Sequence, residues 1–184
     1  LSSYSNVCIV GAGAAGLMCA IEAGKRGRSV RMLEKADRPG RKILISGGGR
    51  CNFTNLYVTP EEYISANEHF CKSALARYTQ WDFISLVEKH HLSWHEKTLG
   101  QLFCDQKSKA VVQMLLDECA EQGVVIETGV HVDSIRKADN FEINTEHGSY
   151  SCDSLVIATG GPSIPRMGAT DFGLQIAKQF GLKN

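Results

Sequence analysis

The chain has 184 residues, of which 43% are hydrophobic, and this length and composition fit one globular domain with a real apolar core. Its 20 basic and 20 acidic residues give a formal net charge of zero. Nothing in that balance favours a nucleic acid or an anionic membrane as a partner. We therefore expect a small-molecule substrate, with no nucleic acid and no membrane as partner, and the sequence leaves the oligomeric state open.

Seven cysteines are present, an odd number without a C-x-x-C pair. Small secreted domains stapled by disulfides use paired cysteines, so this usage is typical of a reducing compartment. No apolar run is long enough to span a membrane, and residues 1–6 are too short and polar for a signal peptide. The expected location is the cytoplasm.

The stretch that organises the chain is a strand, a glycine-rich turn and a helix. Residues 6–10 are mostly apolar, as in a buried strand of a parallel sheet, and apolar residues with helical spacing follow from Leu17 to Arg26. Between them stands Gly11-x-Gly13-x-x-Gly16. In a dinucleotide site the first glycine makes the turn, the second lets the backbone approach a pyrophosphate, and the third lets helix and strand pack closely. The helix N-terminus then offers unpaired N–H groups to the phosphate oxygens.

A second apolar strand, residues 29–33, follows that helix and leads into Glu34, 18 positions after Gly16. At this place the dinucleotide fold carries the acid that binds the ribose hydroxyls. A plain strand–helix–strand unit with a glycine turn is the alternative, and it leaves Glu34 unexplained. Because Glu34 would repel a 2′-phosphate, the pattern favours FAD or NAD over NADP.

A second glycine-rich segment, residues 46–52, contains three consecutive glycines. Ordering three glycines is costly, and a chain bears that cost where its backbone must approach a ligand or adopt positive φ. Successive N–H groups there can form an anion-binding nest. A flexible linker is the alternative, but the neighbouring Arg41, Lys42 and Arg50 favour a ligand-binding loop.

The remaining patterns predict further helices and strands. Short helices are expected at 41–45, from Pro60, at 72–79 and at 81–91, with two short strands at 93–97 and 99–104. An amphipathic helix capped by Ser108 closes at Gly123, before a strand at 124–126, a meander at 130–135, 141–145 and 149–152, a strand at 155–158 and a helix at 171–180. These elements predict an α/β fold: a Rossmann-like domain with a parallel sheet and an inserted β-meander, as one domain over residues 1–184.

No catalytic constellation stands out. His91-x-x-x-His95 has metal-like spacing, but the predicted helix ends near His91 and no third ligand or H-E-x-x-H pattern is present, so no metal site is expected. No Ser-His-Asp or Cys-His arrangement is evident, and Asp105 and Glu96 lack an evident carboxylate partner. Cys51, beside the glycine loop, is a redox thiol or, as we favour, a small packing residue, because no partner cysteine adjoins it.

Two longer segments accompany the glycine turn. They are G-R-K-I-L-I-S-G-G-G-R-C-N-F-T-N at residues 40–55, and L-V-I-A-T-G-G-P-S-I-P at 155–165 followed by G-A-T-D-F-G at 168–173. Together with the turn, they resemble the bacterial YhiN/BaiN-like flavoproteins, a family of NAD(P)/FAD-dependent oxidoreductases. Residues 69–78, 94–97 and 103–105 also look like that family, so the resemblance covers nearly the whole chain.

What the resemblance implies is FAD bound in an extended form across a two-dinucleotide-binding-domain fold. The pyrophosphate would lie against Gly11, Gly13, Ala14, Ala15 and Gly16. The adenosine ribose region would meet Glu34 and Lys35, and the adenine would meet the backbone of Val130. The pyrophosphate, ribityl chain and flavin would be reached by Arg41, Lys42, Ser46, Gly47, Gly48, Gly49, Arg50, Cys51 and Asn52. The family's second flavin-side turn is matched by Thr159, Gly160 and Gly161.

The resemblance implies a redox enzyme in which FAD passes electrons between a donor, with NAD(P)H as one candidate, and a small organic substrate or oxygen. The flavin performs this chemistry, so no protein acid or base need be evident. Family members continue into an inserted domain and a C-terminal stretch of the FAD fold, which this chain is expected to lack. Two alternatives stay open: a cofactor-binding fragment without turnover of its own, and a Rossmann module that binds NAD, which gives the loop at 46–52 no role.

Overall fold

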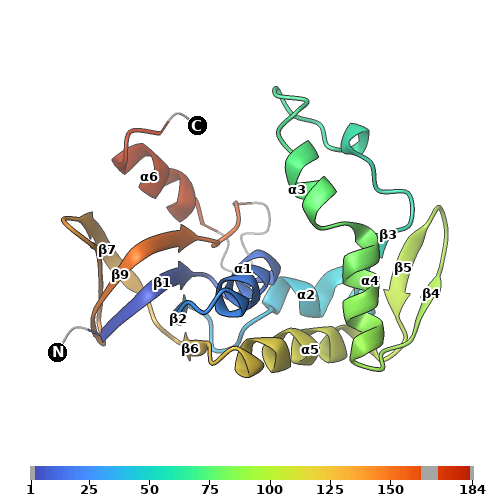
Figure 1. Ribbon diagram of the computed structural model, residues 1–184, viewed down its shortest axis with the longest axis horizontal. Helices are drawn as coiled ribbons and strands as arrows, with labels where there is room; N and C mark the ends of the chain where they lie inside the picture. Colours follow the sequence, from blue (N-terminus) through green and yellow to red (C-terminus); the bar gives the residue numbers. More distant parts are fainter. Residues whose placement is uncertain (1–2, 163–169, 183–184) are drawn as a thin grey trace. The chain divides into compact units, whose positions relative to one another are not determined.

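The computed structural model describes residues 3–162 and 170–182. By its packing the chain divides into two compact units. Unit 1 is formed by Leu1–Lys42 together with Leu115–Asn184, and unit 2 by Ile43–Met114. Each unit contains a sheet of its own, and the two are described in turn (Figure 1).

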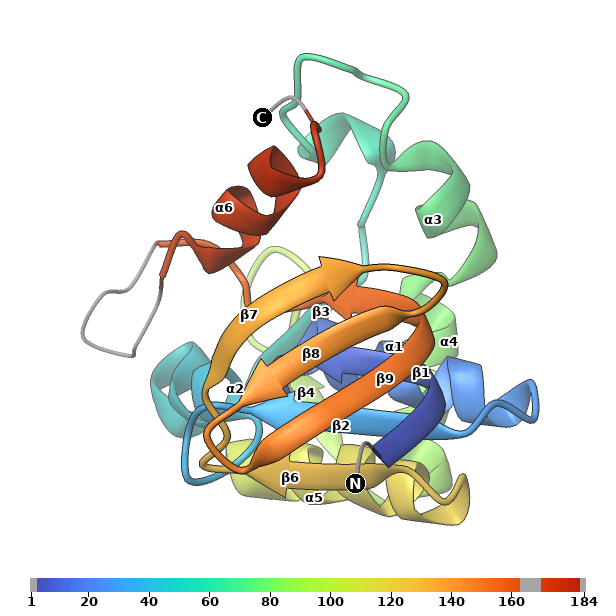
Figure 2. The ribbon, with the colours of Figure 1, turned by 90° about the vertical axis from the view of Figure 1, so that its left-hand side faces the viewer.

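Unit 1 is built on a six-stranded sheet with the strand order β6-β2-β1-β9-β8-β7 (Figure 2). Four neighbouring strands pair in parallel: β6 (Val125–Thr128), β2 (Val30–Glu34), β1 (Ser3–Val10) and β9 (Gly148–Ile157). The sheet continues in antiparallel pairing through β8 (Phe141–Thr145) and β7 (Val132–Lys137). This arrangement confirms the predicted Rossmann-like fold with a parallel sheet and a β-meander.

Strand β9 differs from the prediction, which placed two strands at 149–152 and 155–158. One continuous strand runs from Gly148 to Ile157. Its first part pairs antiparallel with β8, and it also pairs in parallel with β1, where Ile157 lies opposite Val10. The break was expected at the polar residues between the two apolar stretches. Asp153 instead stays in the strand, and its carboxylate accepts a hydrogen bond from the Tyr4 hydroxyl of β1 at 2.7 Å.

Helix α1 (Ala14–Lys25) follows the glycine-rich turn directly. Its buried residues are Gly16, Leu17, Ala20 and Ile21, which form one face at helical spacing. Helix α6 (Phe172–Gln179) follows β9 in the chain. It is attached to the meander by a hydrogen bond of 2.7 Å, which the Gln179 side-chain amide donates to the carbonyl oxygen of Ile135.

Helix α5 (Lys107–Glu121) has residues in both units. The prediction that Ser108 caps this helix is wrong, because the helix begins one residue earlier. The buried Ser108 hydroxyl donates instead to the carbonyl oxygen of Leu44 at 2.9 Å. Its role is therefore a tertiary contact, which satisfies a buried hydroxyl group.

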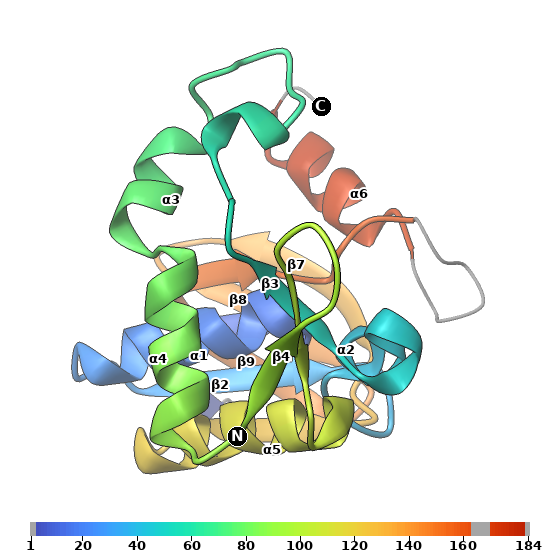
Figure 3. The same ribbon diagram turned by 90° about the vertical axis from the view of Figure 1, so that its right-hand side faces the viewer.

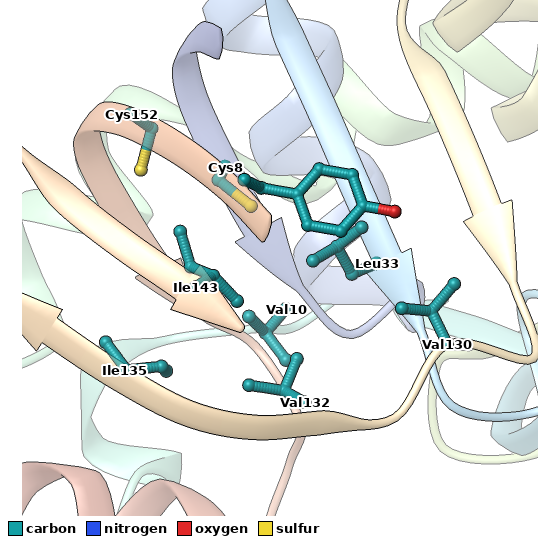
Figure 4. Packing of buried hydrophobic residues seen from close by; sticks show 9 residues of the cluster. Cys8, Val10, Leu33, Val130, Val132, Ile135, Ile143 and Cys152 are labelled. Carbon is teal, nitrogen blue, oxygen red and sulfur yellow. The ribbon is translucent and has the colours of Figure 1, made fainter. Parts of the chain in front are cut away.

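A hydrophobic cluster joins the parallel strands to the meander (Figure 4). Side chains from β1, β2, β7, β8 and β9, together with Val130 just before β7, converge there, and all are at least nine-tenths buried. The members are Cys8, Val10, Leu33, Val130, Val132, Ile135, Ile143, Tyr150 and Cys152. Full burial of an aliphatic side chain contributes about 1.5–3 kcal/mol, so this cluster fixes the end of β2 relative to the start of β7. Glu34 and Val130, two predicted site residues, lie at those two places.

Unit 2 contains a three-stranded antiparallel sheet with the order β3-β5-β4 (Figure 3). The strands are β3 (Asn52–Asn55), β5 (Gln101–Cys104) and β4 (Trp94–Glu96). The helical segments are α2 (Arg41–Ile45), which begins in unit 1, η1 (Ser46–Gly49), η2 (Pro60–Glu62), α3 (Lys72–Arg77) and α4 (Gln80–Lys89). Strand β3 and the helical turn η1 are elements of unit 2 that the sequence did not predict. In the described part of the chain, no helix is both long and apolar enough to cross a membrane.

Candidate functional site

The turn after β1 has a backbone geometry in which two glycines leave no room for a Cβ atom. Gly11 has φ +107°, and a Cβ atom at this position would lie 2.6 Å from the carbonyl oxygen of Ala158. A Cβ atom on Gly16 would lie 2.0 Å from the carbonyl oxygen of Gly11. Both distances are below any real Cβ contact, so these two glycines are required by the close approach of β1, α1 and the end of β9.

The middle of the same turn is open. A Cβ atom on Gly13 would have nothing within 4 Å, and Ala14 and Ala15 are exposed. Gly13 is the N-cap of α1 and makes no side-chain capping hydrogen bond. The first N–H groups of a helix carry a positive partial charge and lack partners within the helix. The start of α1 is therefore accessible to an anionic group, as the pyrophosphate prediction requires.

The carboxylate of Glu34 is held in place beside this turn. One carboxylate oxygen accepts a hydrogen bond from the N–H of Ala12 at 2.7 Å, and the other accepts from the N–H of Ala36 at 2.8 Å. Each carboxylate oxygen has a second lone pair, so a hydroxyl group could still donate to this group. A phosphate would meet a fixed negative charge there, which favours a ribose diol over a 2′-phosphate.

Two further predicted residues lie at the same edge of the unit 1 sheet, beyond the carboxyl ends of its parallel strands. The N–H of Val130 donates to the carbonyl oxygen of Glu34 at 2.9 Å, so Val130 lies directly beside the acid. At the end of β9, Gly160 has φ +73°, and a Cβ atom on it would lie 3.4 Å from the Lys42 ammonium nitrogen. In open parallel sheets this edge is where ligands bind.

The glycine loop of unit 2 is a tight left-handed turn within η1. Gly47, Gly48 and Gly49 have φ values of +55°, +66° and +84°, a region that side chains rarely adopt. A Cβ atom on Gly47 would lie 2.6 Å from the ring of Phe103, whereas Gly48 has open space. The loop is therefore packed against the sheet of unit 2 on one side and open on the other.

Cys51 follows this loop and is 4% exposed. Burial raises the pKa of its thiol above the ordinary value, and the hydrogen bond with Ser46 lowers it to a smaller extent. A buried thiol that stays protonated is a poor nucleophile. These features support the packing role that we favoured for Cys51.

The predicted site residues thus fall into two groups. Unit 1 contains the residues predicted for the dinucleotide edge. They are Gly11, Gly13, Ala14, Ala15, Gly16, Glu34, Lys35, Arg41, Lys42, Val130, Thr159, Gly160 and Gly161. Unit 2 holds the loop residues Ser46, Gly47, Gly48, Gly49, Arg50, Cys51 and Asn52, the last of which begins β3. Residues 163–165 and 168–169, which contributed to the resemblance, lie outside the described residues.

One acid–base pair was missed by the sequence reasoning. In unit 2, the His95 ring nitrogen Nδ1 lies 2.6 Å from a carboxylate oxygen of Asp105. The hydrogen bond from His95 and a second one from Ser93 lower the pKa of Asp105, which is therefore ionised at neutral pH. The two residues are ten positions apart in the chain, and the hairpin of β4 and β5 brings them together. Among the described residues, no group of three or more His, Cys, Asp or Glu side chains is placed to hold a metal ion.

The chain was compared with known proteins. Residues 5–183 match the family model described as the HI0933-like protein Rossmann domain. The chain is 56% identical over 175 residues to a ribosomal RNA dihydrouridine synthase of Escherichia coli, covering 95% of this chain and 44% of that protein. It is 50% identical over 187 residues to the protein of the same name from Haemophilus influenzae, covering 99% of this chain and 47% of that protein. The chain thus spans a little under half the length of these curated relatives.

Among solved structures, the chain is similar to a 3-ketosteroid-Δ4-(5α)-dehydrogenase from Rhodococcus jostii, with a TM-score of 0.64 and 16% identity. The similarity covers 87% of this chain and 46% of that protein. At this identity the likeness concerns the fold alone. Because the family model matches nearly the whole chain, the chain belongs to the HI0933-like Rossmann domain family.

Proposed function

We propose that this chain is the FAD-binding part of an enzyme that reduces uridine to dihydrouridine in ribosomal RNA. The observation that carries the proposal is the 56% identity to the Escherichia coli ribosomal RNA dihydrouridine synthase over 95% of the chain. The closely packed turn at Gly11 and Gly16 and the hydrogen-bonded carboxylate of Glu34 support it, because both are features that dinucleotide-binding folds use.

The chemistry of the proposed reaction suits a flavin. Dihydrouridine differs from uridine by two hydrogen atoms across the C5=C6 bond, so its formation is a two-electron reduction. A bound flavin supplies hydride-transfer chemistry, which amino-acid side chains cannot provide. The chain's contribution is then to bind and orient the cofactor and to place the RNA base against it.

The described residues fit FAD at the dinucleotide edge. The open start of α1 at Gly13 would receive the pyrophosphate, and the Glu34 carboxylate would accept from the ribose hydroxyls. The N–H of Val130 already donates to Glu34, so its carbonyl group is the backbone group left to accept from the adenine amino group. The ammonium group of Lys42 lies beside Gly160, and we expect it to be near a negatively charged group of the bound cofactor.

This proposal departs from the substrate expected from the neutral charge of the chain. A ribosomal RNA replaces the small organic molecule, and the expectation of no nucleic-acid partner stays untested. We keep NAD(P)H as the proposed electron donor. We prefer this proposal to the NAD-binding module, because that alternative gives the loop at residues 46–52 no role.

The experiment uses the full-length parent protein. A visible absorbance spectrum, repeated on the supernatant after heat denaturation, should show a flavin that is released on unfolding. The holoprotein, NADPH or NADH, and ribosomal RNA transcribed in vitro should then yield dihydrouridine, measured by mass spectrometry of digested RNA. A colourless protein that takes up no FAD would refute the proposal that FAD is the cofactor. A yellow protein that reduces no uridine with either donor or with dithionite would refute the proposal that ribosomal RNA is the substrate.

A further inference from the structure

Two apolar side chains at the tip of the hairpin of β4 and β5 are largely exposed. Leu99 is 85% exposed, and Tyr57, which follows β3, is 66% exposed. The two lie side by side, because the Tyr57 ring is 2.6 Å from the place of a Cβ atom on Gly100, the residue after Leu99. Both belong to unit 2, where β3 lies beside the hairpin (Figure 3). We call this pair of side chains the apolar tip.

Hydrogen bonds fix the backbone of the apolar tip. The Asn55 side-chain amide donates to the carbonyl oxygen of Leu99 at 2.7 Å, and its amide oxygen accepts from the N–H of Tyr57 at 2.8 Å. The N–H of Gly100 donates to the Glu96 carboxylate at 2.9 Å. A backbone that is ordered before binding loses little entropy when a partner covers it. The apolar tip is therefore preorganised for a contact.

Leu99 also has a backbone conformation that leucine rarely adopts. Its φ is +52°, in the left-handed region, where a Cβ atom crowds the backbone. Glycine would avoid this strain. Because the side chain is exposed, its burial within this chain offsets little of the strain. A partner that covers the side chain would account for an apolar residue at this position.

Three more apolar side chains are exposed in the long loop between β3 and α3. Tyr63 is about half exposed, Phe70 is largely exposed and Ile64 is fully exposed. The loop is closed near its ends, because the Cys71 thiol donates to the carbonyl oxygen of Pro60 at 3.7 Å. Exposed apolar side chains that gather in one part of a protein mark interaction sites. We call these three side chains and the apolar tip together the apolar surface of unit 2.

The chemistry of this surface favours a protein partner over a nucleic acid. Leu99 and Ile64 have no ring on which a base can stack. The same loop carries three acids, Glu61, Glu62 and Glu68, which would repel the phosphates of a nucleic acid. Tyrosine and phenylalanine are enriched in the interfaces of proteins with proteins.

The size of the surface decides between a separate partner and the same chain. A stable interface between separate proteins uses about 20–30 residues on each side, and this surface offers far fewer. A segment of the same chain meets the surface at a high effective concentration, so a few contacts hold it. The curated relatives match this chain over 95% and 99% of its length, and that match covers only 44% and 47% of their own.

We propose that the apolar surface of unit 2 is the docking site for the part of the parent protein that corresponds to the remaining length of these relatives. Leu99 and Tyr57 are the anchors of this contact. The inference goes beyond the proposed function, because it concerns how the parent is held together and applies whatever its substrate is.

The first experiment measures the thermal unfolding midpoint of the full-length parent and of its Leu99→Gly variant. If Leu99 is exposed in the parent, glycine relieves the left-handed strain, and the midpoint stays the same or rises. If the docked part covers Leu99, the lost apolar contact outweighs that relief, and we expect the midpoint to fall by about 2 °C or more. The matched control is His91→Gly, since His91 is exposed and has φ +56°. Its midpoint should not fall.

The second experiment identifies what covers the surface. A photoreactive benzoylphenylalanine replaces Tyr57 in the full-length parent, which is irradiated with and without in vitro transcribed ribosomal RNA. Mass spectrometry of the digest locates the cross-links. We expect cross-links within one molecule to residues outside the region that this chain matches, with a yield independent of protein concentration. The same sample unfolded in denaturant should give none of them.

Four results would refute the inference. The first is a midpoint of Leu99→Gly that is unchanged or raised, as in His91→Gly. The second is a set of cross-links confined to the region that this chain matches. The third is a cross-link between two copies, with a yield that rises with concentration, and the fourth is a cross-link to the RNA in place of the protein. Dihydrouridine formation is measured separately, so each of these results leaves the proposed function standing.

Discussion

Replacing Glu34 with alanine tests the placement of the ribose and has a predictable effect on stability. The carboxylate accepts from two backbone N–H groups, those of Ala12 and Ala36, at 2.7 and 2.8 Å. A hydrogen bond to a charged group contributes about 1.5–3 kcal/mol. Because Glu34 is only half-buried, water can partly replace it. We expect Glu34→Ala to lower the free energy of unfolding by about 2–4 kcal/mol, and Glu34→Gln, which keeps one oxygen, by about half as much.

The same substitution should weaken FAD binding. One or two ribose hydroxyls that donate to the carboxylate contribute about 1.5–3 kcal/mol each, and each 1.4 kcal/mol is tenfold in affinity, so the loss is about 10- to 20,000-fold. The assay is titration of the apo form of the full-length protein with FAD, followed by quenching of flavin fluorescence. It is run at a temperature where denaturation curves show the variant to be fully folded.

The outcome that contradicts this reasoning is a variant with reduced stability and undiminished FAD affinity. It would mean that Glu34 only stabilises the position of the glycine turn relative to β2, and that the ribose binds elsewhere. The matched control is Glu142→Ala, which removes an exposed carboxylate on β8. This control should change neither the affinity nor the unfolding free energy by more than about 0.5 kcal/mol.

Two further substitutions probe the packing that supports the site. Gly16→Ala places a methyl group 2.0 Å from the Gly11 carbonyl oxygen, so chemical denaturation should show a loss of about 3 kcal/mol or more, and full stability would refute the close packing of turn and helix. Burial, together with the hydrogen bond to Glu127, raises the pKa of Tyr150 to about 12. The fold favours the neutral phenol, so this stabilisation is complete below pH 10 and is lost as the pH rises toward 12. It amounts to about 2–3 kcal/mol, and stability measured from pH 9 to 12 should fall more steeply in the wild type than in Tyr150→Phe.

The parts of the fold that the sequence predicted are those encoded by local patterns. The turn was predicted from its glycine spacing. A Cβ atom on Gly16 would meet the Gly11 carbonyl oxygen five residues away, whereas the clash at Gly11 is with Ala158, which is distant in the sequence. The short strand Asn52–Asn55 was missed, since its four residues have no alternation and gain their structure by pairing with β5. The continuity of β9 was missed for a related reason: hydrogen bonds to two neighbouring strands outweigh the weak strand preference of Asp153.

The candidate site shows the same difference between features that local sequence encodes and features that depend on distant pairing. Glu34 was identified because its distance from Gly16 is fixed by one helix and one strand. The pairing of His95 with Asp105 depends on the register of β4 with β5, in which His95 lies opposite Phe103 and Trp94 opposite Cys104. A shift of that register by one residue would move every side chain to the other face. The sequence could have offered the pair as a candidate once the hairpin was assigned, because Asp105 directly follows β5.

The neutral charge of the chain constrains how the proposed substrate would be recognised. Proteins that bind nucleic acids through many phosphate contacts carry basic patches, and their affinity falls steeply with salt. Here basic and acidic residues balance at 20 each, so this chain offers no general excess of cations to an RNA backbone. Recognition of an unpaired base by stacking and by a few polar groups needs no such excess. If ribosomal RNA is the substrate, this chain's contribution to affinity should depend only weakly on salt.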